Sequence, residues 1–413
     1  MLIRWHFDYI FVEKLALLST NIRDGGLIVP TTLANYLFIR LILNYESFIP
    51  GRSIVNELTK VPPDYGESQS WKGFSPPVFP VEDDRGATCM VISQQLMTSS
   101  SGRVFVDAFY PTDEEKRAVR NFAGGVIKDV IVSFTGMLGQ LDWMDATARR
   151  VAQGKMQKMV QNIAFPDRLT NNTVLDEEHA GLSFEEGADF YSAVATLIAF
   201  NVMAEFDRLS ATTADRTSFG GKTATTNAWF QSKLNSITFP GGLLQPPFFD
   251  INYPAAFNYG ALGIIAGHEI VHAFDFDGQQ MDADGALAPW VDSTTQDGFD
   301  KTANCIVKRI HAAWRAYQQH VERFGGAPLF DDRIFAQFTW DQLFFLNFGK
   351  IWCRKPLGAI DSYRELLASP YSPFKYRVLG TLQNIPAFRA AFNCPANSLY
   401  SSEKHCDVWV PMV

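Results

Sequence analysis

The sequence has 413 residues, of which 47% are hydrophobic and 19% charged. This composition excludes an intrinsically disordered chain and allows two domains or one large one. The net charge of −8 excludes a nucleic-acid partner, because no basic surface is available to displace counterions. No apolar run reaches the roughly 18 residues of a membrane helix, and the first residues contain no cleavable signal, so we expect no membrane segment and no secretion route in this chain.

The first half of the chain is predicted to be helical. Thr112 precedes three acidic residues, and a polar cap followed by acids is typical of a helix start. Residues 50–80 contain six prolines and are predicted to form a loop. Four segments have largely helical spacing or composition and are predicted as helices: residues 31–45, 112 to about 138, 141 to about 163, and 184–209.

The second half has a different pattern. Residues 210–224 are polar and contain glycines, which is typical of a boundary between lobes. Short strands are predicted over residues 227–230 and 236–240, the second ended by a Pro-Gly-Gly turn. Residues 259–274 are predicted to form a helix with small side chains on one side. We therefore predict a mainly α fold with a minor β component (α+β).

The most informative motif is His268-Glu269-Ile270-Val271-His272. Histidines four residues apart project from one face of a helix, so both can bind one tetrahedral Zn²⁺ ion. Glu269 would lie beside the open position of the metal, where a carboxylate can take a proton from zinc-activated water as general base. The alternative is a buried helix with two incidental histidines, which the preceding apolar run 261–266 allows.

The sequence around this motif resembles the neprilysin and endothelin-converting-enzyme family of zinc metallopeptidases. The likeness covers nearly the whole chain through residues 35–37, 141–145, 165–167, 239–250, 259–263, 284–290, 342–348, 351–353, 377–384 and 406–409. It implies a two-lobed, gluzincin-like fold: a truncated helical lobe over residues 1–215 and a thermolysin-like catalytic domain over residues 222–413. It also implies peptide substrates and a place on the extracellular face of the plasma membrane, or secretion.

The resemblance assigns further residues around the metal. Asn227 and Ala228 fall where the family holds the substrate backbone as an added β-strand. Arg377 matches the arginine that pairs with substrate near the metal, and Asp275 would have a structural role next to the zinc helix. Without the resemblance, Asn227 and Ala228 would be an ordinary strand edge and Arg377 a surface charge.

The sequence departs from the family pattern at two places. The family takes its third zinc ligand from a Gly-Glu-Asn-x-x-Asp segment, which is missing here between about Lys308 and Ala312. The family histidine that stabilises the oxyanion is replaced by Tyr371, which still donates a hydrogen bond but is neutral at pH 7. Four residues after the junction are candidates for a replacement ligand: His311, His320, Asp331 and Asp332.

The five cysteines form an odd number, so at least one thiol is unpaired. The resemblance pairs Cys305 with Cys406. It leaves Cys89, Cys353 and Cys394 without partners, because the family's partners lie in N-terminal sequence that this chain does not contain, as does the family's membrane anchor.

Two functions remain open from the sequence. The first is a zinc metalloendopeptidase that hydrolyses small peptides with Glu269 as general base. The second is an inactive pseudo-peptidase that binds peptides or a full-length homologue. A third possibility is that the chain does not fold stably, because the missing segment includes a core helix.

Overall fold

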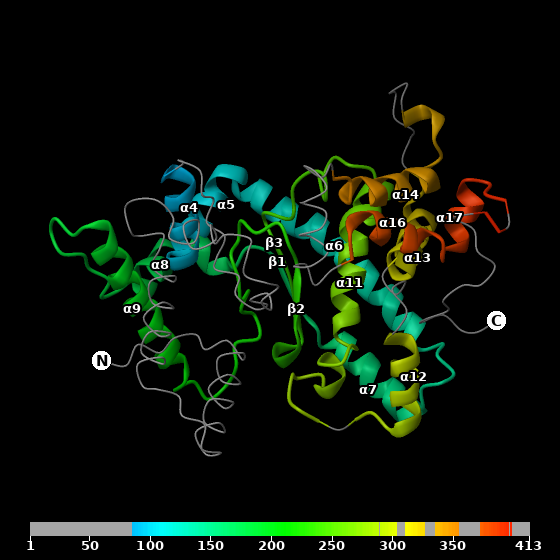
Figure 1. The fold of residues 1–413 in the computed structure, drawn as a ribbon, viewed down its shortest axis with the longest axis horizontal. Helices are drawn as coiled ribbons and strands as arrows, with labels where there is room; N and C mark the ends of the chain where they lie inside the picture. The colour runs from blue at the N-terminus through cyan, green and yellow to red at the C-terminus, as the bar shows by residue number, and fades with distance from the viewer. Residues whose placement is uncertain are drawn as a thin grey trace, which may run out of the picture. The chain divides into compact units, whose positions relative to one another are not determined.

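The computed structural model describes residues 85–288, 290–303, 310–326, 335–354, 372–395 and 397–398. Most of this part of the chain is helical (Figure 1), and its strands form one three-stranded sheet. The predicted mainly α fold with a minor β component is therefore confirmed. The predicted helix over residues 31–45 and the loop over residues 50–80 lie outside the described residues. Within the described ranges, every helix is too short or too polar to cross a membrane.

The chain divides into two compact units, and the smaller contains residues 1–97 and 179–211. Its described helices are α4 (Arg85–Leu96) and α9 (Phe190–Arg208), which contact each other. The Asn201 side chain donates a hydrogen bond to the carbonyl oxygen of Leu96 at 2.8 Å. The Asp189 carboxylate accepts from the backbone N–H of Ser192 and caps α9, so this helix begins at Phe190 rather than at residue 184.

The larger unit contains residues 98–178 and 212–413. Its helical elements before the central sheet strand are α5 (Thr98–Phe109), α6 (Asp113–Leu138), α7 (Ala146–Gln157), η2 (Asp167–Thr170), α8 (Asn172–Glu178) and η3 (Ser232–Leu234). Its strands are β1 (Val160–Ala164), β2 (Trp229–Gln231) and β3 (Ser236–Pro240). The helical elements that follow are α10 (Ala255–Asn258), η4 (Tyr259–Gly263), α11 (Ile264–His272), η5 (Gly278–Gln280), α12 (Ser293–Ala303), α13 (Ile310–Phe324), η6 (Phe335–Gln337), α14 (Trp340–Ile351), α16 (Phe374–Leu382) and α17 (Pro386–Ala391).

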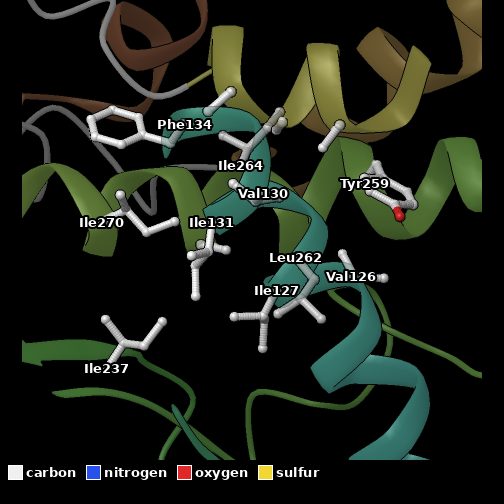
Figure 2. Packing of buried hydrophobic residues seen from close by; sticks show 14 of the residues in the cluster. Val126, Ile127, Val130, Ile131, Phe134, Ile237, Tyr259, Leu262, Ile264 and Ile270 are labelled. Carbon is white, nitrogen blue, oxygen red and sulfur yellow. The ribbon is translucent and has the colours of Figure 1, made fainter. Parts of the chain in front are cut away.

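Helix α6 is the central helix of the larger unit. The predicted cap is confirmed, because the Thr112 hydroxyl accepts from the N–H of Glu115 at 3.2 Å and the Glu115 carboxylate accepts from the N–H of Thr112 at 2.9 Å. The apolar face of α6 packs against η4, α11 and α13. Figure 2 shows this core, with Val126, Ile127, Val130 and Ile131 on α6 and Leu262, Ile264 and Ile270 on η4 and α11.

The sheet has the order β1-β3-β2. Strand β3 is central and all of its side chains are buried, with β1 parallel on one side and β2 antiparallel on the other. The predicted helix over residues 141–163 is wrong in its last part, because α7 ends at Gln157 and β1 begins at Val160. Backbone pairing with β3, far away in the sequence, outweighs the helical preference of this segment.

The helix that carries the histidine motif is the end of a longer helical segment. Elements α10, η4 and α11 follow one another without a break, and η4 is a π-helical turn. The small residues predicted on one side permit close packing: a Cβ on Gly260 would lie 2.3 Å from the carbonyl oxygen of Phe344 on α14, and one on Gly263 would lie 3.5 Å from the Ala313 Cβ on α13. The predicted helix over residues 259–274 is thus confirmed, with its start moved to Ala255 and its end to His272.

Candidate metal centre

The two histidines of the motif lie in the last two turns of α11, four residues apart. Their Nε2 atoms are 3.3 Å apart, and the rings are inclined by 68° with their centroids at 4.5 Å. Two nitrogen ligands about 2.0–2.1 Å from a tetrahedral zinc ion lie about 3.3–3.4 Å from each other. The donor atoms of His268 and His272 therefore have the spacing of a chelating pair.

Glu269 lies next to this pair and is almost fully buried, with 5% of its side chain exposed. Its Oε1 atom is 3.8 Å from Nε2 of His268, so the carboxylate is beside the nitrogen that faces His272. The His268 side chain is 19% exposed and that of His272 40% exposed, so His272 is the more open of the two to solvent. A carboxylate in this position can exchange a proton with a molecule that the histidines help to hold.

Asp275 fixes the ring of His272. Its Oδ2 atom is 2.6 Å from Nδ1 of His272, while Oδ1 accepts from the backbone N–H groups of Asp277 at 3.1 Å and Gly278 at 2.9 Å. Burial alone would raise the pKa of Asp275, but the hydrogen bonds from His272 and the Gly278 N–H outweigh it and lower the pKa. An anionic carboxylate in this position favours the imidazole tautomer with its proton on Nδ1, in which Nε2 keeps a lone pair for a metal.

The sequence assigned Asp275 only a structural role. Its place three residues after the second histidine is the sequence signal for the hydrogen bond observed here, because the chain turns back at the end of α11. Ala273 caps the helix and the side chain of Phe274 is buried against Phe134 at 5.7 Å, which directs Asp275 toward the histidine face.

Lys155 was not singled out from the sequence, and it lies close to this turn. The side chain is fully buried, and Nζ donates to the carbonyl oxygens of Gly278 and Met281. Burial lowers the pKa of Lys155 to about 8, and the carboxylates of Asp275 and Asp282 oppose this shift. No local pattern in α7 could have revealed this, since the acceptors are more than a hundred residues away in the sequence.

The described ranges contain no group of three His, Cys, Asp or Glu side chains arranged to hold a metal ion. Of the candidates for a replacement ligand, His311 lies in the first turn of α13, which packs against α11. His320 lies further along α13, where its Nδ1 is 3.3 Å from the Tyr259 hydroxyl and 4.0 Å from the Asp129 carboxylate. Asp331 and Asp332 lie outside the described residues. A third ligand from this set stays a prediction.

The predicted substrate-binding pair Asn227 and Ala228 directly precedes β2. This strand is at the edge of the sheet as described, and it contacts α11. The Asn227 side chain is exposed, whereas Ala228 is buried with 4% of its surface exposed. An extended peptide could add to such an edge close to the histidine helix, and binding at this position stays a prediction.

Arg377 lies in α16, and its guanidinium is 4.7 Å from the ring centroid of Phe374 and 4.9 Å from that of Trp352. Its Nε donates to the carbonyl oxygen of Ser372 at 2.7 Å. The structure thus gives the arginine a defined position, while its predicted pairing with substrate stays untested. Tyr371 lies outside the described residues.

Three cysteines form no disulfide within the part of the chain that the structure describes: Cys89, Cys353 and Cys394. Cys89 and Cys353 are exposed, and Cys394 is partly buried. The predicted partners Cys305 and Cys406 lie outside the described residues, so their disulfide stays a prediction.

Comparisons with known proteins place this geometry in a family. Two models described as Peptidase family M13 match the chain, one over residues 18–166 and the other over residues 227–312 and 307–408. The second match is in two pieces that meet at residues 307–312, where we expect the third-ligand segment to be missing.

Similar full-length proteins extend the match. Neprilysin-11 of Caenorhabditis elegans is 29% identical over 405 residues, which are 91% of this chain and 45% of that protein. Neprilysin-1 of the same organism is 31% identical over 355 residues, which are 79% of this chain and 46% of that protein. The chain therefore spans less than half the length of these two relatives.

Solved structures agree on the fold. The zinc metalloprotease Zmp1 of Mycobacterium tuberculosis, solved in complex with an inhibitor, superposes with a TM-score of 0.63 at 23% identity over 79% of this chain and 51% of that one. The family models together match most of the sequence, and the relatives align over most of it. The chain therefore belongs to peptidase family M13.

Proposed function

We propose that this chain is a zinc metallopeptidase module that hydrolyses peptide bonds, with His268 and His272 holding the metal and Glu269 acting as general base. The observation that carries the proposal is the 3.3 Å separation of the two Nε2 atoms beside a buried carboxylate. Membership of a peptidase family supports it.

The donor set determines what the site can do. Two neutral imidazoles suit zinc, and a bound zinc ion would polarise a peptide carbonyl and make water acidic enough to react near neutral pH. His272 is kept in the binding tautomer by Asp275 at 2.6 Å. Zinc in catalytic sites has three protein ligands, so either a third group joins the pair in the working protein or the metal is held weakly.

Glu269 would move the protons. Its carboxylate, next to the His268 nitrogen, would take a proton from the attacking water and pass it to the amine that leaves. Substrate would bind as an extended strand along the edge at Asn227 and Ala228, which places its backbone near α11. Arg377 would pair with the substrate near the metal. This arrangement favours short peptides, whose backbone is accessible along its length.

The test is cleavage of an internally quenched hydrophobic peptide together with the zinc content per chain. Wild type is expected to contain zinc and to cleave in a chelator-sensitive way, and Glu269→Gln to bind zinc but lose about 10²–10⁴-fold in rate. Glu322→Gln, an exposed carboxylate on α13, is the matched control and should keep full activity. Cleavage that survives in Glu269→Gln would contradict the proposed mechanism.

One observation favours a second function. The described residues hold no complete three-ligand group, so the module could bind peptides at the β2 edge without cleaving them. If the chain is such a pseudo-peptidase, wild type and Glu269→Gln should bind the quenched peptide with the same affinity, and neither should cleave it. Fluorescence anisotropy is one way to measure this binding. Zinc-dependent turnover by wild type would exclude this second function.

A further inference from the structure

We propose that Lys155 is a positioning residue of the metal centre: by binding the turn over residues 278–281, it fixes Asp275 and, through Asp275, the ring of His272. This inference rests on the proposed function, because it concerns the same histidine pair. It adds a residue from α7, an element that carries none of the site residues predicted from the sequence.

The hydrogen bonds form a continuous path from Lys155 to the histidine. Nζ of Lys155 donates to the carbonyl oxygens of Gly278, the first residue of η5, and of Met281, the residue that follows η5. The N–H of Gly278 donates to Oδ1 of Asp275 at 2.9 Å, and Oδ2 of the same carboxylate is 2.6 Å from Nδ1 of His272. The buried ammonium of Lys155 therefore binds the turn over residues 278–281, and this turn also binds the Asp275 carboxylate.

The turn has little room to adjust if this anchor is lost. A Cβ on Gly278 would lie 2.0 Å from the carbonyl oxygen of His272 and 2.6 Å from the backbone carbon of Ala273. The turn is thus packed directly against the C-terminal end of α11. A shift of Gly278 would move either Asp275 or the end of the helix that bears His272.

The charge of Lys155 supports the same role. An ammonium group is costly to bury, and packing alone would be served by a neutral side chain of the same length. Here the group has two carbonyl acceptors and feels the carboxylates of Asp275 and Asp282. The two carbonyl acceptors therefore fix where the ammonium group lies, and with it the turn over residues 278–281.

The main chain at Lys155 is held separately from the side chain. The Asn235 amide donates to the carbonyl oxygens of Lys155 and Ala283, each at 2.9 Å. This link does not involve Nζ, so it remains when the lysine side chain is replaced. Substitution at position 155 thus tests the ammonium group and not the attachment of α7.

The experiment measures zinc affinity by competition with a chromophoric chelator, with thermal unfolding of the metal-free protein in parallel. Lys155→Met and Asp275→Asn are each expected to weaken zinc binding by about 10–100-fold, as loss of a partner behind a metal ligand does. The double variant should bind zinc no more weakly than Asp275→Asn alone, because Lys155 acts through Asp275. Lys158→Met is the matched control: Lys158 is an exposed lysine at the end of α7 that pairs with Asp284 at 2.8 Å, and its loss should leave zinc affinity unchanged.

The outcomes separate this inference from the proposed function. The role of Lys155 would be overturned if Lys155→Met bound zinc as tightly as wild type. It would also be overturned if the loss of zinc affinity in the double variant equalled the product of the two single losses. Either result would leave the proposed function intact. Wild-type protein that binds no zinc would overturn both. If Lys155→Met does not fold, Lys155→Gln retains one donor and is expected to show a smaller loss of zinc affinity; an unchanged affinity in that variant would overturn the inference.

Discussion

The helical segment formed by α10, η4 and α11 has a histidine–aspartate cluster near each end, and the two clusters differ in their chemistry. At the end of α11, His272 is 2.6 Å from Asp275. Near the start, His320 of α13 is 4.0 Å from Asp129 of α6, and the hydroxyl of Tyr259 contacts both residues. Among the residues that the structure describes, a second imidazole lies in the first cluster, where Nε2 of His268 is 3.3 Å from Nε2 of His272.

The two clusters also differ in the contacts around the histidine and the carboxylate. Both oxygens of Asp129 are already used, since Oδ2 accepts from Tyr259 and Oδ1 from Arg323 at 3.2 Å. His320 packs against the rings of Tyr259 and Phe324, with centroids at 5.3 Å and 4.8 Å. The cluster near Tyr259 therefore ties three helical elements together, whereas the cluster at His272 directs two nitrogen atoms to one point.

The largest expected effect is on zinc affinity, which should change in a variant of the first cluster and not in a variant of the second. His272→Ala should weaken zinc binding by more than the roughly 10–100-fold that follows loss of a partner behind a ligand, because it removes a ligand itself. His320→Ala should leave zinc affinity unchanged. Calorimetric titration of metal-free protein with zinc measures both, and a comparable loss in His320→Ala would show that this histidine takes part in the site.

A second effect, on stability, belongs to the cluster near Tyr259. Tyr259 is 2% exposed and donates to a carboxylate, so Tyr259→Phe should lower the free energy of unfolding by about 1.5–3 kcal/mol without changing zinc affinity. The control is Tyr376→Phe on α16, where the tyrosine is 59% exposed. Urea unfolding is the measurement, and equal midpoints for the two variants would mean that the Tyr259 hydroxyl contributes nothing.

The smallest effect is a pH dependence of stability from His320. Burial lowers the pKa of His320, and the nearby Arg323 adds to this while Asp129 opposes it. The unfolded chain therefore takes up the proton at a higher pH than the folded chain, so this group destabilises the fold as pH falls below the ordinary histidine pKa of about 6.5. Between pH 7 and pH 5, the free energy of unfolding should fall less steeply in His320→Gln than in wild type. If the free energy of unfolding fell more steeply in the variant, the pKa of His320 would be raised in the folded protein and not lowered.

The local signals in the sequence were sufficient for much of the fold and for the placement of the two histidines on one helix face. The Thr112 cap, the β3 strand and the spacing of His268 and His272 are each specified within a few neighbouring residues, and the structure has them where the sequence predicts them. The glycines before the motif were equally informative, because only a residue without a side chain allows α14 to approach the helix as closely as it does at Gly260.

The sequence could not reveal features that depend on distant partners. Residues 158–163 have helical composition, yet Val160 pairs with Ser236 in a parallel sheet. Lys155 lies on an ordinary-looking helix, and only the fold brings it to Gly278. The same limit applies to a third metal ligand, for which the sequence offers candidates and no position in space.

The central claim is that the two imidazoles of α11 bind one metal ion. Crystals of the zinc-loaded protein measured at the zinc absorption edge test this directly. The account predicts one anomalous peak about 2.0–2.1 Å from Nε2 of both His268 and His272. A zinc peak elsewhere, or bound to only one of the two rings, would contradict it.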